Sequence, residues 1–461
     1  MIGCTQWSYA PYKHFFHETG DIYICRVVPY ETSIHFEWLA EEGKTYSVFY
    51  REREQGEFCK AGETTGSEFD ILNLKTELDY EFFVSCGEEK SRVRLARTGA
   101  YVGITVNYLH PEDDVYAFSG RCLCSPSFVQ HPDGYLLASM DVFKGNMPQT
   151  LSLIFRSDDG GETWHYVSEL YPCFWGKMFI HKKELYMLSC STEYGDLLIG
   201  KSTDGGKTFG MPTVLLRGSA RGVVPGVHKN PENMMYYNGR IYGTLEWGSW
   251  SAGFHAPMVM SCDENADLLN AANWHFTPPV KYDPTWPGVA QGPSTGNIEG
   301  TLVVLPDGKL YNIMRYDTSR TVPNHGLVIA YAVNTEDPDA PLTYAKTIEM
   351  PTTTAKFMIK QDSESGLYYS VICRVHEKCT YGRNLLSLIR SADAEHWELA
   401  CDIFDYRDAD PQQIGFQYTD FEFDGDDIIC LVRTGFNGAS NFHDTNYSTF
   451  YRIKDFRKYP M

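Results

Sequence analysis

The stretch Ser157-Asp158-Asp159-Gly160-Gly161-Glu162-Thr163-Trp164 decides the fold, because its pattern returns at Ser202-Thr203-Asp204-Gly205-Gly206-Lys207-Thr208-Phe209. Both copies read S-x-D-x-G-x-T followed by an aromatic residue. Each copy follows an apolar run and precedes another extended segment, so we predict that each forms the turn of a β-hairpin. The glycine pair supplies positive φ angles, and the serine and aspartate side chains can bind nearby backbone amides. The terminal aromatic residue then packs beneath the hairpin.

Two weaker copies extend this pattern. The segment from Ser391 to Trp397 lacks both glycines and is one residue shorter, and Ser261-Cys262-Asp263 is followed by Trp274 after an inserted turn. A hairpin motif that returns along the chain indicates a repeat architecture.

The motif resembles the Asp box, or BNR repeat, of the sialidase (neuraminidase) superfamily. That resemblance implies an all-β fold, a six-bladed β-propeller of the sialidase type. The box lies on the rim of such propellers, so it implies little about chemistry, and we interpret the boxes as structural.

Residues 99–461 divide into units of four short strands, as propeller blades do. Five units span about 124–170, 173–216, 228–282, 296–350 and 354–405, and a sixth keeps three clear strands between 416 and 453. The strand at 101–106 is available to complete the sixth unit. Closing a ring with strands from both ends of the domain removes open sheet edges.

Residues 20–98 carry short alternating runs separated by polar turns, which are typical of a β-sandwich. Trp38, Leu72-Asn73-Leu74 and Tyr80-x-Phe82-x-Val84 make this segment similar to a fibronectin type III module, with Tyr80 at the tyrosine-corner position. Such modules more often act as spacers or docking units than as catalysts. Residues 1–19 are expected to be a loosely ordered lead-in.

The charge balance limits the partners. The 461 residues include 40 Lys plus Arg and 60 Asp plus Glu, a formal net charge of −20, which argues against nucleic acid and anionic membranes. No run approaches a membrane span, and residues 1–16 lack the apolar core of a signal peptide, so we expect a cytoplasmic protein. Thirteen scattered cysteines without a C-x-x-C pair favour reduced thiols over disulfides or zinc. Without a G-x-x-x-x-G-K, G-x-G-x-x-G or H-E-x-x-H motif, no cofactor and no required metal are expected.

Several residues match sialidase positions. The segment 297–310 with Met314-Arg315 resembles the one that carries a catalytic glutamate and a triad arginine, so Glu299 and Arg315 fall on those positions. Arg383 matches another triad arginine, and Tyr418 matches the nucleophilic tyrosine. The resemblance implies that Glu299 takes the proton of Tyr418, which attacks the anomeric carbon, while the arginines hold a substrate carboxylate.

Two other family positions are occupied differently. Cys124-Ser125-Pro126 stands where the family has Arg-Ile-Pro, and Lys144-Gly145-Asn146-Met147-Pro148 stands where a loop carries the acid/base aspartate. The ordinary route of sialic acid hydrolysis is therefore in question. Arg121 and Asp141 are the candidates to replace the missing groups, and Asp141 is our candidate catalytic carboxylate.

The third and last units add polar and aromatic candidates. Histidine can act as a general acid or base near neutral pH, and tryptophan faces stack on sugar rings. We expect His228 to be catalytic. The candidates for substrate binding, besides Arg315 and Arg383, are Glu246, Trp247, His255, Arg433 and His443.

The sequence thus predicts a carbohydrate-active enzyme with an oligosaccharide substrate. We expect an exo-acting glycoside hydrolase that removes a terminal acidic sugar, such as a sialic acid or a uronate. Two alternatives stay open. The His/Tyr/Arg-rich set is also similar to propeller polysaccharide lyases, which cleave uronates by β-elimination, and the propeller could bind glycans without catalysis.

Overall fold

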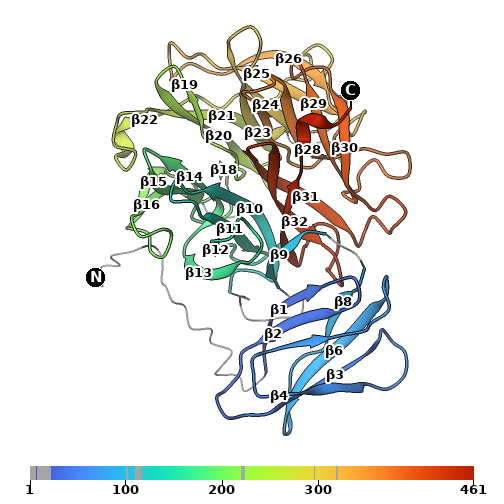
Figure 1. Cartoon of the computed structure of the whole chain (residues 1–461). Coiled ribbons are helices and arrows are strands. Elements are labelled where there is room, and N and C mark those ends of the chain that lie inside the picture. Colours follow the sequence, from blue (N-terminus) through green and yellow to red (C-terminus); the bar gives the residue numbers. More distant parts are fainter. Residues whose placement is uncertain are drawn as a thin grey trace.

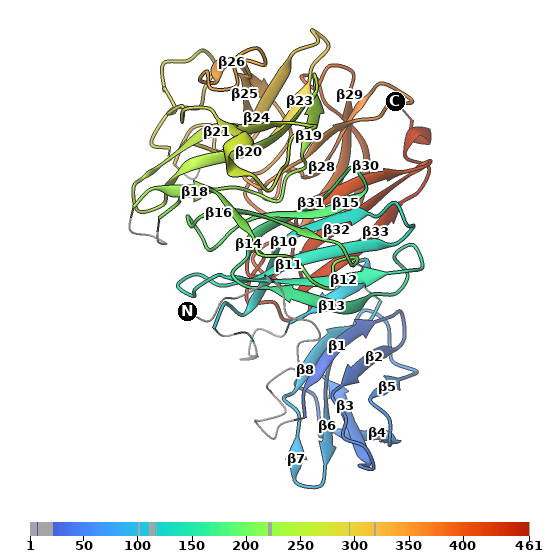
Figure 2. The same cartoon turned by 90° about the vertical axis from the view of Figure 1, so that its left-hand side faces the viewer.

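The computed structural model describes Trp7 and residues 22–99, 102–109, 116, 118–219, 224–294, 296–317 and 320–460. They form an all-β chain of two parts, a small N-terminal unit and a β-propeller, with short 3-10 turns at Ala271–Asn273 and Phe456–Lys458. Figures 1 and 2 show the N-terminal unit, in blue, against one side of the propeller. Apart from Trp7, the predicted lead-in at 1–19 lies outside the described residues.

The N-terminal unit contains two antiparallel sheets, with strand orders β1-β2-β5 and β4-β3-β6-β7, and β8 pairs with β6. The strands are β1 (Ile24–Pro29), β2 (Ile34–Trp38), β3 (Tyr46–Glu52), β4 (Cys59–Thr64), β5 (Glu68–Ile71), β6 (Asp79–Cys86), β7 (Glu89–Lys90) and β8 (Arg94–Arg97). Ile34, Phe36 and Trp38 are buried at every second position of β2, because successive side chains point to opposite faces. The Tyr80 hydroxyl accepts a hydrogen bond from the Lys75 N–H at 3.0 Å, the bond expected of a tyrosine corner.

Six antiparallel sheets follow one another along the rest of the chain. The first three contain β10 (Cys122–Gln130), β11 (Leu136–Phe143), β12 (Leu151–Ser157), β13 (His165–Leu170); β14 (Phe174–His181), β15 (Glu184–Cys190), β16 (Leu197–Ser202), β17 (Thr213–Leu216); and β18 (Gly226–His228), β19 (Met235–Tyr237), β20 (Arg240–Ser249), β21 (Phe254–Asp263), β22 (Trp274–Phe276). The last three contain β23 (Asn297–Val304), β24 (Leu310–Tyr316), β25 (Leu327–Ala332), β26 (Thr343–Glu349); β27 (Ile359–Gln361), β28 (Tyr368–Cys373), β29 (Leu385–Ser391), β30 (Glu398–Asp405); and β31 (Gly415–Asp424), β32 (Asp427–Gly435), β33 (Tyr447–Ile453) with β9 (Ile104–Tyr108). Because β9 pairs with β33, both ends of the domain close the ring.

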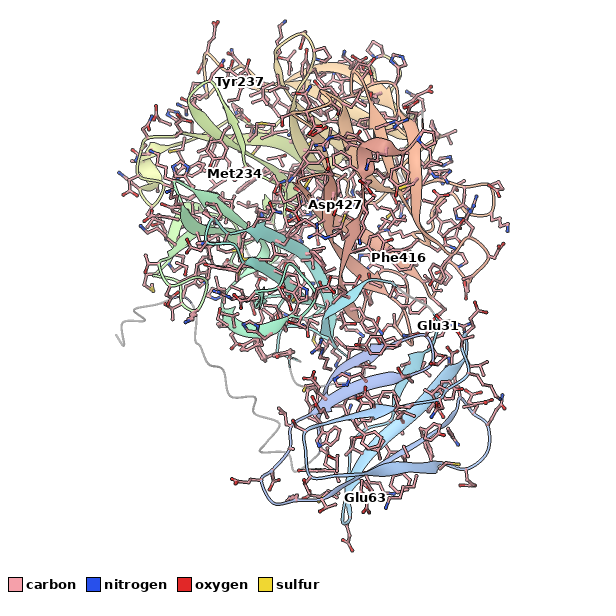
Figure 3. The ribbon with its side chains drawn as sticks, in the orientation of Figure 1. Glu31, Glu63, Met234, Tyr237, Phe416 and Asp427 are labelled. Carbon is pink, nitrogen blue, oxygen red and sulfur yellow. The ribbon has the colours of Figure 1, made fainter. Side chains whose placement is uncertain are left out.

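We call the first strand of a sheet its innermost strand, because first strands of several neighbouring sheets contact one another. β10 contacts both β14 and β31, which joins the first sheet to the second and to the last, and β23 contacts β27. Apolar side chains fill the space between neighbouring sheets, as Phe128, Trp164 and Phe450 do between the first and last. Another cluster joins the N-terminal unit to the propeller and contains both Trp38 and Phe416, the latter labelled in Figure 3.

The repeated motif closes the hairpins between the third and fourth strands. Gly161 N–H donates to Ser157 Oγ at 2.8 Å, and Thr163 N–H donates to Asp159 Oδ1 at 2.9 Å. The copy that begins at Ser202 repeats both bonds. The motif therefore satisfies the backbone of each turn with its own side chains, as expected.

Gly161 allows the first hairpin to pack on the closing sheet. Its φ is 102°, and a Cβ there would lie 2.2 Å from Cε1 of Phe450 in β33. We therefore expect Gly161→Ala to lower the free energy of unfolding by about 2 kcal/mol or more, from backbone strain together with the clash. Urea denaturation measures this loss.

Gly134→Ala is the matched control. Gly134 also has a positive φ, of 90°, but a Cβ there meets nothing within 4 Å. Equal losses in the two variants would show that the contact with Phe450 adds nothing to the backbone strain.

Trp7 corrects part of the prediction for the N-terminal segment. Its side chain is buried, its Nε1 donates to Pro172 O at 2.9 Å, and its ring meets Phe209 edge to face at 6.3 Å. At this residue the segment is anchored on the second sheet of the propeller.

Two broader expectations concern thiols and membranes. The twelve cysteines in the described segments are all free. Within the part of the chain that the structure describes, no helix has the length and apolar character needed to cross a bilayer.

Candidate active site

Four innermost strands are bulged at equivalent places. The register of β10, β14, β23 and β31 shifts where Ser125, Trp175, Glu299 and Tyr418 lie, and these residues have φ of 51°, 54°, 58° and 57°. Positive φ is uncommon outside glycine, and bulges re-aim side chains beside functional sites. The equivalent bulges therefore gather side chains from four sheets at one end of the ring.

Gly300 makes the bulge at Glu299 possible. A Cβ on Gly300 would lie 2.2 Å from both Asn312 Oδ1 and Met314 Sδ, so a larger residue does not fit. The glycine after the glutamate thus lets β23 approach β24 closely while the Glu299 side chain turns out of the sheet.

Tyr418 and Glu299 are in direct contact. The Tyr418 hydroxyl donates to Glu299 Oε1 at 2.5 Å, and the other oxygen, Oε2, pairs with Arg315 Nε at 2.8 Å. All three side chains are buried. Burial raises the pKa of Tyr418 to about 12, whereas Arg315 acts in the opposite direction. The phenol therefore stays protonated until a base removes its proton, and Glu299 is the base in contact.

Three guanidinium groups surround the Tyr418 ring. The Cζ atoms of Arg315, Arg383 and Arg433 lie 6.0, 5.9 and 5.0 Å from its centroid. Arg433 comes from β32, so the last sheet supplies the third cation. The sequence placed Arg433 among the substrate-binding candidates without linking it to the other two.

Backbone carbonyls and one amide hold these arginines. Arg315 donates to Thr354 O, Arg383 to the side chain of Gln417, and Arg433 to the carbonyl oxygen of His443. The Nε atoms of Arg383 and Arg433 are buried and have no hydrogen-bond partner among the described residues. A buried donor without a partner is costly, so these atoms are suited to an anionic ligand.

His228 and Glu246 form a second pair beside the first. His228 Nδ1 lies 2.6 Å from Glu246 Oε2, and both side chains are buried. The other oxygen of Glu246 accepts the backbone N–H of Glu299 at 2.8 Å. Burial raises the pKa of Glu246. One buried carboxylate thus orients His228 and fixes the strand that carries Glu299.

Aromatic residues enclose His228. The ring centroid of His228 lies 4.4 Å from that of Trp175, 5.0 Å from that of His255 and 6.5 Å from that of Trp250. The Tyr194 hydroxyl lies 3.1 Å from His255 Nε2. Burial, with smaller contributions from His228 and Arg315, lowers the pKa of His255 to about 2, so His255 is neutral.

Asp141 is placed differently from the expectation for a catalytic carboxylate. One oxygen accepts a hydrogen bond from the Ser152 hydroxyl, and the other accepts the Trp175 N–H at 2.6 Å. Burial raises its pKa to about 7. Asp141 accepts the backbone N–H of Trp175, just as Glu246 accepts that of Glu299. In both cases the carboxylate lies on the second strand of the preceding sheet.

Trp247 and His443 are the two remaining sequence candidates. Trp247 packs against the hydrophobic cluster between the second and third sheets. The His443 ring meets Phe143 edge to face at 5.5 Å, its Nδ1 lies 3.0 Å from Asp444 Oδ1, and burial lowers its pKa to about 4. His443 therefore meets the Tyr418 group through its backbone, because its carbonyl oxygen accepts a hydrogen bond from Arg433.

Sequence reasoning missed two buried ion pairs. Lys177 pairs with Asp420, which also accepts the Phe128 N–H at 2.9 Å, and Lys356 lies 3.5 Å from Glu232. The sequence signal is a charged residue two positions after the bulge, at Lys177 and Asp420. The Lys177–Asp420 pair and the Phe128 bond tie β14, β31 and β10 together.

Metal-binding geometry occurs at one place in the described residues. His35, Glu37 and Glu68 lie close enough to share an ion, but they belong to the N-terminal unit, and Arg26 pairs with Glu37 at 2.7 Å. The cluster is on β2 and β5, away from Tyr418.

Comparisons with known proteins bear on the fold. No protein-family profile matches the sequence, and no characterised protein matches it either. The structure resembles an α-L-arabinanase of Penicillium chrysogenum complexed with arabinobiose, at 16% identity and a TM-score of 0.50 over 78% of this chain and 99% of that chain. A GH93 α-L-arabinofuranosidase of Fusarium graminearum with arabinobiose is 14% identical, with a TM-score of 0.47 over 77% of this chain and 98% of that chain. The FN5 domain of Drosophila Lar is 22% identical, with a TM-score of 0.16 over 18% of this chain and 98% of that chain. The first likeness supports the β-propeller fold, and the two lower scores support no conclusion.

Proposed function

We propose that this chain is a glycoside hydrolase that removes a terminal acidic sugar, a sialic acid or a uronate, from an oligosaccharide. Each of the six sheets would be one blade of a sialidase-type propeller, and the N-terminal unit a fibronectin type III-like docking module. The proposal rests on the Tyr418 side chain, whose hydroxyl donates to Glu299 Oε1 at 2.5 Å and whose ring centroid lies 5.0 to 6.0 Å from three guanidinium carbons.

The Tyr418–Glu299 pair suits nucleophilic catalysis. A phenol attacks an anomeric carbon only when a base removes its proton, and Glu299 is in hydrogen-bond contact to do so. Arg315 Nε lies 2.8 Å from the second oxygen of Glu299 and orients the carboxylate. Attack would give a sugar bound covalently to Tyr418, which water then hydrolyses as Glu299 returns the proton.

The three arginines account for the acidic substrate. Three positive charges lie close together around Tyr418, and burial together with Arg315 and Arg433 lowers the pKa of Arg383. A substrate carboxylate would relieve the repulsion among the three guanidinium groups and accept hydrogen bonds from the unpaired Nε–H groups of Arg383 and Arg433. Arabinobiose, the ligand of the similar structures, has no carboxylate, so it serves as the neutral comparison.

Mass spectrometry and ultraviolet absorbance on one panel test the proposed function. The panel contains a sialyllactose, uronate-capped oligosaccharides and arabinobiose. The proposal predicts cleavage of acidic members, with products that sum to substrate plus one water, and no cleavage of arabinobiose. Products that sum to the substrate alone, with the absorbance of an unsaturated uronate, would establish a lyase instead. Binding without any product would establish a glycan-binding propeller.

Arg433→Met tests the carboxylate grip. Because Arg433 is a buried charge with a partnerless Nε, we expect kcat/KM on the acidic substrate to fall about 100-fold, equivalent to about 3 kcal/mol. Activity on the same substrate with its carboxylate reduced to an alcohol should not change between variant and wild type. Arg51→Met in the N-terminal unit is the control. An equal loss of kcat/KM on both substrates would show that Arg433 does not bind the substrate carboxylate.

A further inference from the structure

Cleavage of a glycosidic bond needs a proton on the departing oxygen, because a sugar alkoxide is a poor leaving group. Glu299 cannot supply it, since Glu299 receives the proton of Tyr418 in the same step. Asp141 has both oxygens engaged by Ser152 and Trp175, and Glu246 has both engaged by His228 and Glu299. The donor must therefore be another group beside the Tyr418–Glu299 pair.

We propose that His228, oriented by Glu246, is the general acid and base of the reaction, and that the aromatic residues around it form the subsite for the leaving group. The inference rests on the proposed function. It assigns to the His228–Glu246 pair the protonation of the departing oxygen, which Tyr418, Glu299 and the arginines do not provide.

The hydrogen bond at Nδ1 selects the working atom of His228. Glu246 Oε2 lies 2.6 Å from Nδ1, so the carboxylate holds the proton on that nitrogen and leaves Nε2 to meet a ligand. A buried carboxylate also stabilises the imidazolium that must exist before proton donation. Glu246 is thus a positioning residue, and His228 is the group that touches the reacting oxygen.

A short chain of hydrogen bonds fixes His228 relative to the nucleophile. Glu246 links His228 to the backbone N–H of Glu299, and Glu299 Oε1 accepts the Tyr418 hydroxyl. The acid and the nucleophile come from different sheets, yet the same two carboxylates hold both. Proton transfer needs such fixed geometry, because small displacements slow it strongly.

The surroundings of His228 suit a sugar ring. Trp250 is 46% exposed and its ring lies 4.5 Å from that of His255, next to His228. Exposed indole faces bind the apolar face of a sugar. His255 stays neutral, so it adds no charge that would disfavour the imidazolium of His228.

The protons balance over two steps. In the first, the bond from Tyr418 Oη to the anomeric carbon forms, the glycosidic bond breaks, the Tyr418 proton moves to Glu299, and Nε2 of His228 protonates the departing oxygen. In the second, neutral His228 takes a proton from water, the water oxygen replaces Tyr418 on the anomeric carbon, and Glu299 returns the proton to Tyr418. The net reaction consumes one water.

Leaving-group dependence tests this role in the full-length protein. The probes are two glycosides of the acidic sugar, N-acetylneuraminic or glucuronic acid, that wild type cleaves: the 4-methylumbelliferyl glycoside and the lactoside. We expect His228→Ala to slow release from the lactoside about 100-fold, but to change formation of the glycosyl-enzyme from the aryl glycoside little, because an acidic phenol leaves without a proton. Added azide should then raise turnover of the aryl glycoside by the variant and yield the glycosyl azide, because azide attacks without a base.

Two further variants separate this role from a structural one. Glu246→Gln should give the same leaving-group dependence to a smaller degree. His443→Gln, at the His443–Asp444 pair, should affect both probes equally if it affects either. Equal slowing of both probes by His228→Ala, without rescue by azide, would overturn the assignment while the proposed function stands. Wild-type protein that cleaves neither probe would overturn both proposals.

Discussion

Tyr418→Phe should reduce cleavage of the acidic substrate by more than about 10³-fold, the loss expected when a covalent nucleophile is removed. The substitution deletes one oxygen atom and leaves the ring in place among the three guanidinium groups. Binding of substrate should therefore persist, and the loss should appear in kcat. Initial rates by product mass spectrometry and binding by calorimetry measure the two effects separately.

The control for this variant is Tyr237→Phe. Tyr237 ends β19 on the third sheet, is labelled near the top of Figure 3, and donates its hydroxyl to Gly308 O on the neighbouring sheet. It takes no part in the Tyr418 contacts, so activity should match wild type. A Tyr418→Phe protein with more than a tenth of wild-type activity would exclude the phenol as nucleophile.

Asp420→Ala should lower the free energy of unfolding by about 3–5 kcal/mol, because it leaves the buried Lys177 ammonium without its partner. The same change removes the acceptor of the Phe128 N–H, which joins the first and last sheets. Equilibrium denaturation in urea, followed by tryptophan fluorescence, measures the loss.

Two comparisons show whether burial is the cause. Asp408→Ala breaks an exposed pair with Lys378 and should leave the unfolding midpoint unchanged. Lys177→Met combined with Asp420→Leu removes both charges and should recover part of the stability lost in Asp420→Ala. Equal effects of Asp420→Ala and Asp408→Ala would contradict a buried ionic tie between the sheets.

The propeller could be predicted from the sequence because its signals are local. The S-x-D-x-G-x-T motif makes its hydrogen bonds within seven residues, and each hairpin turn therefore shows in the sequence. The segments that resemble sialidases led to Glu299, Arg315, Arg383 and Tyr418, and the structure brings these four together.

The rest of the site depends on ring closure. Arg433 faces Tyr418 from a second strand, where no motif marks it, and Trp175 reaches His228 only through the bulge in β14. Asp420 bonds the backbone of Phe128 across 292 positions of sequence. Such contacts follow from which sheets are neighbours in space, so a single sequence does not reveal them. Asp141 shows the converse, since a carboxylate at a plausible position has one oxygen engaged by the Trp175 N–H and the other by the Ser152 hydroxyl.

The role of Tyr418 as the nucleophile can be tested by locating the sugar on the enzyme during turnover. Wild-type protein is mixed with the aryl glycoside of the acidic sugar, quenched in acid within milliseconds, digested with pepsin and analysed by peptide mass spectrometry. We expect one peptide, containing Tyr418, that is heavier by the mass of the glycosyl residue and disappears when the substrate is exhausted. An adduct on another residue, or turnover without any adduct and with an inverted anomeric product, would contradict it.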